Sequence, residues 1–290
     1  MCAHRELAIF APCDPRLIGD GQADKKNGKY DRRSIVKNIG LAGFGFIGSF
    51  LYERLKDNKE VSVQAVWDPI SEKTKFLDSQ IVCKDLEDLG SRSLDLIVEV
   101  AHADVVKALL PIIKSGADLM IASMTCLSDP LFRNRVEQDA VQNGRKIFLP
   151  HGAVLGLDGL RDGRSLLDKV TITTTKHPQS LGITNSQIKK PEVLFDGSSQ
   201  DACSKFPRNV NVHAAIALAG LGFEATRSII IADPNTNKMH HRIEALGRGL
   251  NWNLEIESFS AGEVTGSYTP ESLYQSLLTI LSEENGFCIV

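Results

Sequence analysis

Strand-like and helix-like stretches alternate through the first half of the chain. Apolar or β-branched runs of four to eight residues, typical of buried strands, occupy residues 35–42, 61–67, 94–100, 119–122 and 146–149. Stretches with helical character lie between them, at residues 47–55, 103–115 and 130–143. Strands that alternate with helices in this way predict an α/β fold with a doubly wound parallel sheet over residues 34–149.

The pattern changes after Pro150. Residues 170–176 alternate threonine with apolar side chains, as a strand with one exposed face does, and residues 227–232, 243–245 and 253–258 look similar. An Ala- and Leu-rich helix is expected over residues 212–221. We therefore expect a second, α+β domain with an open mixed sheet over residues 150–267. A C-terminal helix within residues 268–286 is expected to return to the first domain.

The first 33 residues differ from the rest. Residues 19–33 are rich in Gly, Asp, Lys and Arg and show no apolar period. Such a segment cannot bury enough apolar surface to fold alone, so we expect residues 1–33 to form a flexible extension.

Composition and charge exclude several classes of partner. The 290 residues are 42% hydrophobic and 24% charged, with a net charge of −3, which gives no electrostatic reason to bind nucleic acid or an anionic membrane. No apolar run reaches the ~20 residues that a membrane-spanning helix needs. The six cysteines are scattered without a Cys-x-x-Cys pair, so we expect free thiols, no metal site and a cytoplasmic location.

A glycine-rich turn follows the first predicted strand and precedes the first predicted helix. It has the G-x-G-x-x-G spacing of a Rossmann dinucleotide site. Gly43 would allow the tight turn, Gly45 the approach of the pyrophosphate, and Gly48 close packing of helix on strand. Phe46 and Ile47 begin the helix, whose terminal N–H groups would bind the phosphates.

The second predicted strand ends at Asp68, about 20 residues past the glycines, where this fold places the carboxylate that binds the ribose hydroxyls. That charge would repel a 2′-phosphate, and no arginine follows closely. We therefore expect NAD as cofactor, with NADP possible. Further contacts are expected from the loops after later strands, at residues 100–102, which include Ala101, and 123–126.

Four segments of the chain together form a recognisable pattern. They are the glycine turn with Asp68, Gly152–Asp158, Phe206–Val212 before an Ala-rich helix, and Ala232-Asp233-Pro234 followed by His241. With these segments the chain resembles the L-aspartate dehydrogenase family from about Val36 to Leu281. The resemblance implies a Rossmann domain with a substrate domain on an open sheet, and usually a homo-oligomer. It also implies oxidation of L-aspartate to iminoaspartate, which yields oxaloacetate and ammonia or feeds NAD biosynthesis.

The resemblance further implies roles for three residues of this sequence. The family's catalytic histidine falls on His241, its cofactor-contacting asparagine on Asn211, and a small cofactor-contacting residue on Cys126. Asn211 is equally compatible with a helix N-cap.

Amine oxidation requires a group that accepts a proton near neutral pH, and histidine is the usual choice. We expect His241 to act as this general acid and base from a loop, residues 233–241, that faces the cleft. His240 is the rival, but adjacent residues of an extended segment point in opposite directions, so only one can face the site. His177 and His213 are expected to be structural.

A dicarboxylate substrate needs cationic or N–H donors. The candidates are the backbone of Gly152 and Ala153, His151, Lys176 and Arg208. Lys176 and Arg208 fit solvated surface charges equally well.

Two alternatives stay open at the level of sequence. One is a Rossmann oxidoreductase for another small substrate, although the Glu-Lys-Pro of the glucose–fructose oxidoreductase type is absent at residues 123–125. The other is a non-catalytic dinucleotide-binding or sensing protein. Thr125-Cys126 and residues 264–267 depart from the family pattern and keep that alternative open, whereas His241 argues against it.

Overall fold

The computed structural model of the chain describes residues 36–183, 188–259 and 266–282. The expected flexible extension, residues 1–33, lies outside the described residues, as do residues 264–265 and 283–286. The described residues all belong to one compact unit, so a domain boundary near residue 150 stays a prediction.

The first sheet is parallel throughout, with the strand order β2-β1-β3-β4-β5. It confirms the doubly wound parallel sheet. Its strands are β1 (Lys37–Ala42), β2 (Val61–Trp67), β3 (Leu96–Glu99), β4 (Asp118–Ile121) and β5 (Ile147–Phe148). Its α-helices are α1 (Phe46–Leu55), α2 (Leu86–Ser91), α3 (Ala103–Leu109) and α4 (Pro130–Gln142). Short 3-10 turns lie at Ser71–Lys73, Leu110–Ser115 and Met124–Ser128.

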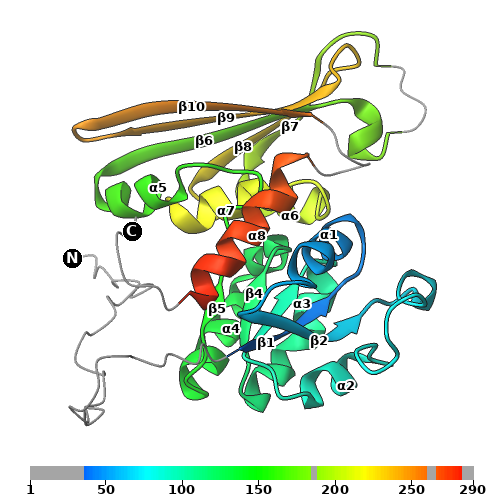
Figure 1. Cartoon of the computed structure of the whole chain (residues 1–290). Helices are drawn as coiled ribbons and strands as arrows, with labels where there is room; N and C mark the ends of the chain where they lie inside the picture. The colour runs from blue at the N-terminus through cyan, green and yellow to red at the C-terminus, as the bar shows by residue number, and fades with distance from the viewer. Residues whose placement is uncertain (1–35, 184–187, 260–265, 283–290) are drawn as a thin grey trace, which may run out of the picture. The chain divides into compact units, whose positions relative to one another are not determined.

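The last helix, α8 (Tyr268–Leu281), packs beside α1 on this sheet (Figure 1). Leu273 and Leu277 are buried in one apolar cluster with Leu41 and Leu51 of β1 and α1. Arg54 of α1 donates to Glu271 at 3.0 Å across the same contact. The chain therefore closes the core of its first sheet with its C-terminal helix.

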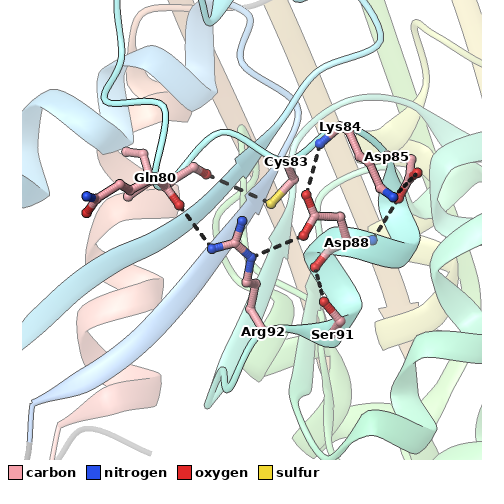
Figure 2. A network of polar contacts seen from close by, with 8 residues as sticks. Gln80, Cys83, Lys84, Asp85, Asp88, Ser91 and Arg92 are labelled. Atoms are coloured by element: carbon pink, nitrogen blue, oxygen red, sulfur yellow. Dashed lines mark hydrogen bonds and ion pairs between the residues drawn. The ribbon is translucent and has the colours of Figure 1, made fainter.

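A polar network fastens the connection from β2 to β3 around α2 (Figure 2). Asp85 caps α2 by accepting from the Asp88 backbone N–H at 2.7 Å, and Arg92 Nε donates to the Asp88 carboxylate at 3.2 Å. Arg92 also donates to the Gln80 carbonyl at 3.0 Å. Hydrogen bonds thus order a segment that the apolar pattern left unassigned.

The second sheet is mixed, in the order β10-β9-β6-β8-β7; β6 and β8 run parallel and the other neighbours antiparallel. Its strands are β6 (Leu167–Lys176), β7 (Glu192–Ser198), β8 (Thr226–Ala232), β9 (Lys238–Gly247) and β10 (Leu250–Phe259). The helices α5 (Leu157–Gly163), α6 (Ser199–Lys205) and α7 (Asn211–Ala219) lie on one face of it (Figure 1). Short 3-10 turns lie at Arg164–Leu166 and Pro178–Leu181. This arrangement confirms the open mixed sheet of the expected α+β part.

The prediction of a loop over residues 233–241 was wrong at its end, because β9 begins at Lys238 and includes His241. The strand alternates buried Met239, His241, Ile243 and Ala245 with more exposed residues. The alternation of apolar and polar residues was not recognised in the sequence, because the polar side chain of His241 occupies one of the inward positions. The consequence is that His241 stands on a sheet and not on a loop.

Candidate functional site

A cleft of about 780 Å³ lies at the carboxyl ends of β1 to β4, against β6, β9 and the start of α7. Its position follows the rule that ligands of open α/β sheets bind beyond the carboxyl ends of the strands. The residues of its wall that bear on function are Gly45, Phe46, Ile47, Asp68, Ala101, His151, Gly152, Ala153, Lys176, Arg208, Asn211 and His241. Most of the residues singled out in the sequence therefore share one cleft.

A side chain would meet different surroundings at each of the three glycines of the turn. Gly43 has a φ of +111°, and a Cβ there would approach the backbone of Val100 and Ala101 to 2.9 Å. A Cβ on Gly48 would overlap the Gly43 carbonyl oxygen. A Cβ on Gly45 would meet nothing within 4 Å, so that glycine borders open space at the start of α1. Gly43 and Gly48 shape the turn, and Gly45 borders the cleft.

The Asp68 carboxylate accepts a hydrogen bond from the backbone of the glycine turn and forms an ion pair with Lys73. Its side chain, 4% exposed, accepts from the Phe44 backbone N–H at 2.7 Å and from the Ile70 N–H at 2.9 Å. Lys73 Nζ lies 3.4 Å from the carboxylate. No arginine follows Asp68 closely, but Lys73, which was not singled out from the sequence, brings a positive charge to the same end of the cleft.

Glu99 is a buried acid that joins the loops after β3 and β4. It accepts from the Ala101 N–H at 2.8 Å, the Ser123 N–H at 3.0 Å and the Ser123 hydroxyl at 2.9 Å. Burial raises the pKa of its carboxyl to about 7, although these donors favour the charged form. Sequence reasoning missed it; the available signal was a carboxylate between two apolar residues, Val98 and Val100, inside the run 94–100.

Asn211 fastens the turn after β4. It is the first residue of α7, and its Oδ1 accepts from the Thr125 N–H at 3.2 Å, whereas the N-cap position belongs to Val210. Asn211 therefore does not act as the N-cap. The Cys126 thiol donates to the Ser123 carbonyl at 3.2 Å and is buried, with its pKa raised by burial to about 12. Cys126 stands behind the cleft wall and not in it.

His241 presents a neutral imidazole to the cleft. It is 2% exposed, and its Nδ1 lies 2.9 Å from the Thr174 hydroxyl of the neighbouring strand. Burial, assisted by the charge of Lys176, lowers its pKa to about 3. His240 points to the opposite face, 3.8 Å from Glu255, and does not line the cleft.

Lys176 is the last residue of β6 and is only 4% exposed. Its Nζ donates to the Asn209 carbonyl at 3.3 Å, and burial lowers its pKa to about 8. The interpretation of Lys176 as a solvated surface charge is therefore wrong. Arg208 also borders the cleft but is exposed. The Oδ1 of Asn209, at the same wall, is buried and has no hydrogen-bond partner among the described residues.

Across the described ranges, no three or more His, Cys, Asp or Glu side chains gather closely enough to hold a metal ion. No helix within those ranges has the length and apolar character to cross a bilayer.

Two family models match the chain. The model described as "Aspartate dehydrogenase, C-terminal" matches residues 158–280, and "Homoserine dehydrogenase, NAD binding domain" matches residues 43–150. The first match covers β6 to β10, with His241, and the second covers the glycine turn and Asp68.

Two curated relatives match this chain over nearly the whole of their own length. The L-aspartate dehydrogenase of Nitrosopumilus maritimus is 32% identical over 270 residues, covering 87% of this chain and 97% of that protein. The L-aspartate dehydrogenase of Methanosarcina acetivorans is 34% identical over 262 residues, covering 84% and 94%.

A solved structure shares the fold. The crystal structure of aspartate dehydrogenase from Thermotoga maritima superposes with a TM-score of 0.71 at 27% identity, covering 87% of this chain and 99% of that one. A scyllo-inositol dehydrogenase from Lactobacillus casei, at 12% identity and a TM-score of 0.51, resembles the chain in fold alone.

Proposed function

This chain belongs to the L-aspartate dehydrogenase family, and on that premise we propose that it catalyses the NAD(P)-dependent oxidative deamination of L-aspartate with His241 as general acid and base. The observation that carries the proposal is one cleft that joins the glycine turn and Asp68 to a buried, neutral His241. In the overall reaction, L-aspartate and NAD(P)⁺ give iminoaspartate, NAD(P)H and a proton. Water then converts iminoaspartate to oxaloacetate and ammonia.

The residues of the cleft fit a dinucleotide. Open space borders Gly45 at the N-terminus of α1, where backbone N–H groups without helical partners favour phosphate. The Asp68 carboxylate can accept hydrogen bonds from ribose hydroxyls. Asn209 Oδ1 is buried, has no hydrogen-bond donor among the described residues, and could accept one from the cofactor. When bound, the nicotinamide supplies the hydride acceptor. Gly45, Phe46, Ile47, Asp68, Ala101 and Asn211 are the residues we propose to line this site, with Gly43 and Gly48 shaping it and Cys126 behind it.

His241 would take a proton from the substrate nitrogen and later assist the attack of water. Burial, and after it the Lys176 ammonium, opposes a positive charge on the imidazole and lowers the pKa of His241. A dicarboxylate bound beside Lys176 would neutralise that ammonium, remove its share of the shift and so raise the pKa of His241, while the effect of burial stays. His241 would thus be a stronger base with the acidic substrate bound than without it.

Lys176 is the cation we propose for a substrate carboxylate. Lys176→Met keeps the length of the side chain and removes its charge, so the KM for L-aspartate is expected to rise by about 10- to 100-fold, the worth of a charged hydrogen bond. In the unaltered protein KM should also rise as the pH passes about 8, because Lys176 then loses its proton.

Lys169→Met, an exposed site on the same strand, is the matched control and should leave KM unchanged. Initial rates at several pH values check the prediction. A KM for Lys176→Met within about twofold of the control would exclude the proposed contact.

Asp68 is expected to set the choice between NAD and NADP. Asp68→Asn keeps the shape of the side chain but removes the charge, and it leaves Lys73 without its ion pair. The ratio of Kd for NADP to Kd for NAD should fall by about tenfold or more, because repulsion of the 2′-phosphate is lost. Lys73→Met should move the ratio the opposite way. Calorimetric titration with both cofactors measures it, and equal ratios in all three proteins would refute the assignment.

The function itself is tested by mixing purified protein with L-aspartate and either NAD⁺ or NADP⁺ and following the absorbance of the reduced cofactor. D-aspartate, L-asparagine and L-glutamate serve as controls. Turnover of L-aspartate above these controls supports the proposal. Tight cofactor binding without turnover of any amino acid would instead favour a cofactor-binding or sensing protein.

We also propose a homo-oligomer in the cytoplasm, on the family resemblance and the scattered cysteines. Light scattering of the purified protein tests the first part, and fluorescence imaging of the tagged chain tests the second.

A further inference from the structure

A chain of hydrogen-bonded side chains leads from His241 away from the cleft. The Thr174 hydroxyl lies 2.9 Å from His241 Nδ1 and 2.7 Å from His213 Nε2. His213 Nδ1 lies 2.8 Å from the Ser228 hydroxyl, which lies 2.7 Å from the Ser199 hydroxyl. All five residues are buried, and only His241 lines the cleft.

The mixed sheet assembles this chain. Thr174 of β6 stands directly opposite His241 of β9 in the antiparallel register, and Ser228 occupies an inward position of β8. His213 reaches them from α7, which covers that face of the sheet. The neighbouring inward positions Ile172 and Ile243 are apolar. Water has little access here, so each polar hydrogen needs a protein partner.

Thr174 can donate one hydrogen but faces two imidazole nitrogens. If it donates to His213 Nε2, it can only accept from His241, which must then carry its hydrogen on Nδ1 and expose a bare Nε2. If it donates to His241 Nδ1, the hydrogen of a neutral His241 must lie on Nε2. The tautomers of the two rings are therefore coupled through one hydroxyl.

Both rings are neutral at physiological pH, since burial holds the pKa of His213 well below its usual range and that of His241 at about 3. The charge of Lys176 then selects between the two arrangements. It stands two residues beyond Thr174 on the same face of β6 and lines the cleft with His241. A positive charge there favours a bare nitrogen and disfavours an N–H that points into the cleft.

We propose that Thr174 and His213 are positioning residues that hold His241 in its Nδ1–H tautomer, with Nε2 free to accept a proton from the substrate. This inference rests on the proposed role of His241 as the base. His213 serves as the acceptor for the hydrogen of Thr174, and Ser228 in turn accepts from His213 Nδ1–H. A neutral base with its hydrogen on Nε2 could not take a proton at the cleft.

Nitrogen-15 NMR of the full chain with labelled histidine tests the tautomer without reference to activity. His241 of the unaltered protein should show a bare Nε2 and a protonated Nδ1, with the signals assigned by their loss in His241→Gln. In Thr174→Val, which has the same shape but no hydroxyl, His241 should shift toward the Nε2–H form. His213→Leu should do the same, because the hydrogen of Thr174 then turns to His241.

Kinetics provide the second measurement. In Thr174→Val, kcat for L-aspartate should fall on the order of 100-fold, with KM within about threefold, because the loss is in proton transfer and not in binding. Thr174→Ser should restore both kcat and the tautomer. Cofactor affinity reports whether each variant is folded.

An Nε2–H tautomer in the unaltered protein overturns the proposal, even if every variant fails to fold. So does a bare Nε2 that persists in Thr174→Val and His213→Leu. If the tautomers behave as expected but His241→Ala keeps its activity, the proposed role of His241 fails while the positioning of its ring stands. The two failures are therefore distinguishable.

Discussion

Replacing His241 with alanine is expected to lower kcat for L-aspartate by on the order of 10²- to 10⁴-fold, the usual contribution of a general acid and base. Cofactor binding should change little, because the imidazole lies on the second sheet and the glycine turn on the first. Stopped-flow and steady-state rates, with cofactor affinity measured by fluorescence, check both parts.

The adjacent histidine is the control for this variant. His240→Ala removes an imidazole from the opposite face of β9, half-buried beside Glu255, and should keep kcat within about twofold of the unaltered protein. If His241→Ala and His240→Ala behave alike, or if His240 is the more sensitive position, the assignment of the base is wrong.

The second large effect is expected from the glycine turn. Gly48→Ala forces a Cβ against the Gly43 carbonyl oxygen, a backbone atom that cannot turn aside. The clash should cost about 3 kcal/mol of unfolding free energy, the upper part of the range for overpacking. A chain of this size would lose roughly 6–12 °C in Tm. Calorimetry of the protein without cofactor measures the loss.

Gly45→Ala separates packing from binding. A methyl group at Gly45 meets no atom within 4 Å and the backbone φ is −82°, so Tm without cofactor should stay within about 2 °C of the unaltered value. The methyl group would, however, occupy the space proposed for the pyrophosphate, and Kd for NAD should rise by about tenfold or more. If Gly48→Ala leaves Tm unchanged, or if Gly45→Ala binds NAD normally, the roles given to the two glycines do not hold.

The first sheet could be predicted because its signals are local. Near-continuous apolar runs, helical stretches between them and a glycine turn of fixed spacing each lie within about ten residues of sequence. The edge strand β7 and the short α6 were missed. β7 carries Glu192, Asp196 and Gly197, and α6 is seven residues long, so neither shows a clear period.

The candidate site divides in the same way. Because side chains alternate along an extended segment, the sequence predicted that His240 and His241 point in opposite directions. The structure places them on opposite faces of β9. The burial of Lys176 and the partnership of Thr174 with His213 depend on pairing between distant strands and a helix. One sequence does not contain such pairings, because they follow from the register of the whole sheet. His213 was expected to be structural, and its contact with Thr174 could not be predicted, because it depends on this pairing.

The contact of α8 with α1 bears on how the protein is made. Leu273, Tyr274 and Leu277 complete the same apolar cluster as Ile39 and Leu41, yet more than two hundred residues separate the two groups along the chain. During translation, the first sheet emerges from the ribosome while the helix that covers it has not been synthesised. Until then β1 and α1 leave that apolar surface exposed, so a strand and a helix that are made early are among the last parts of the core to be completed.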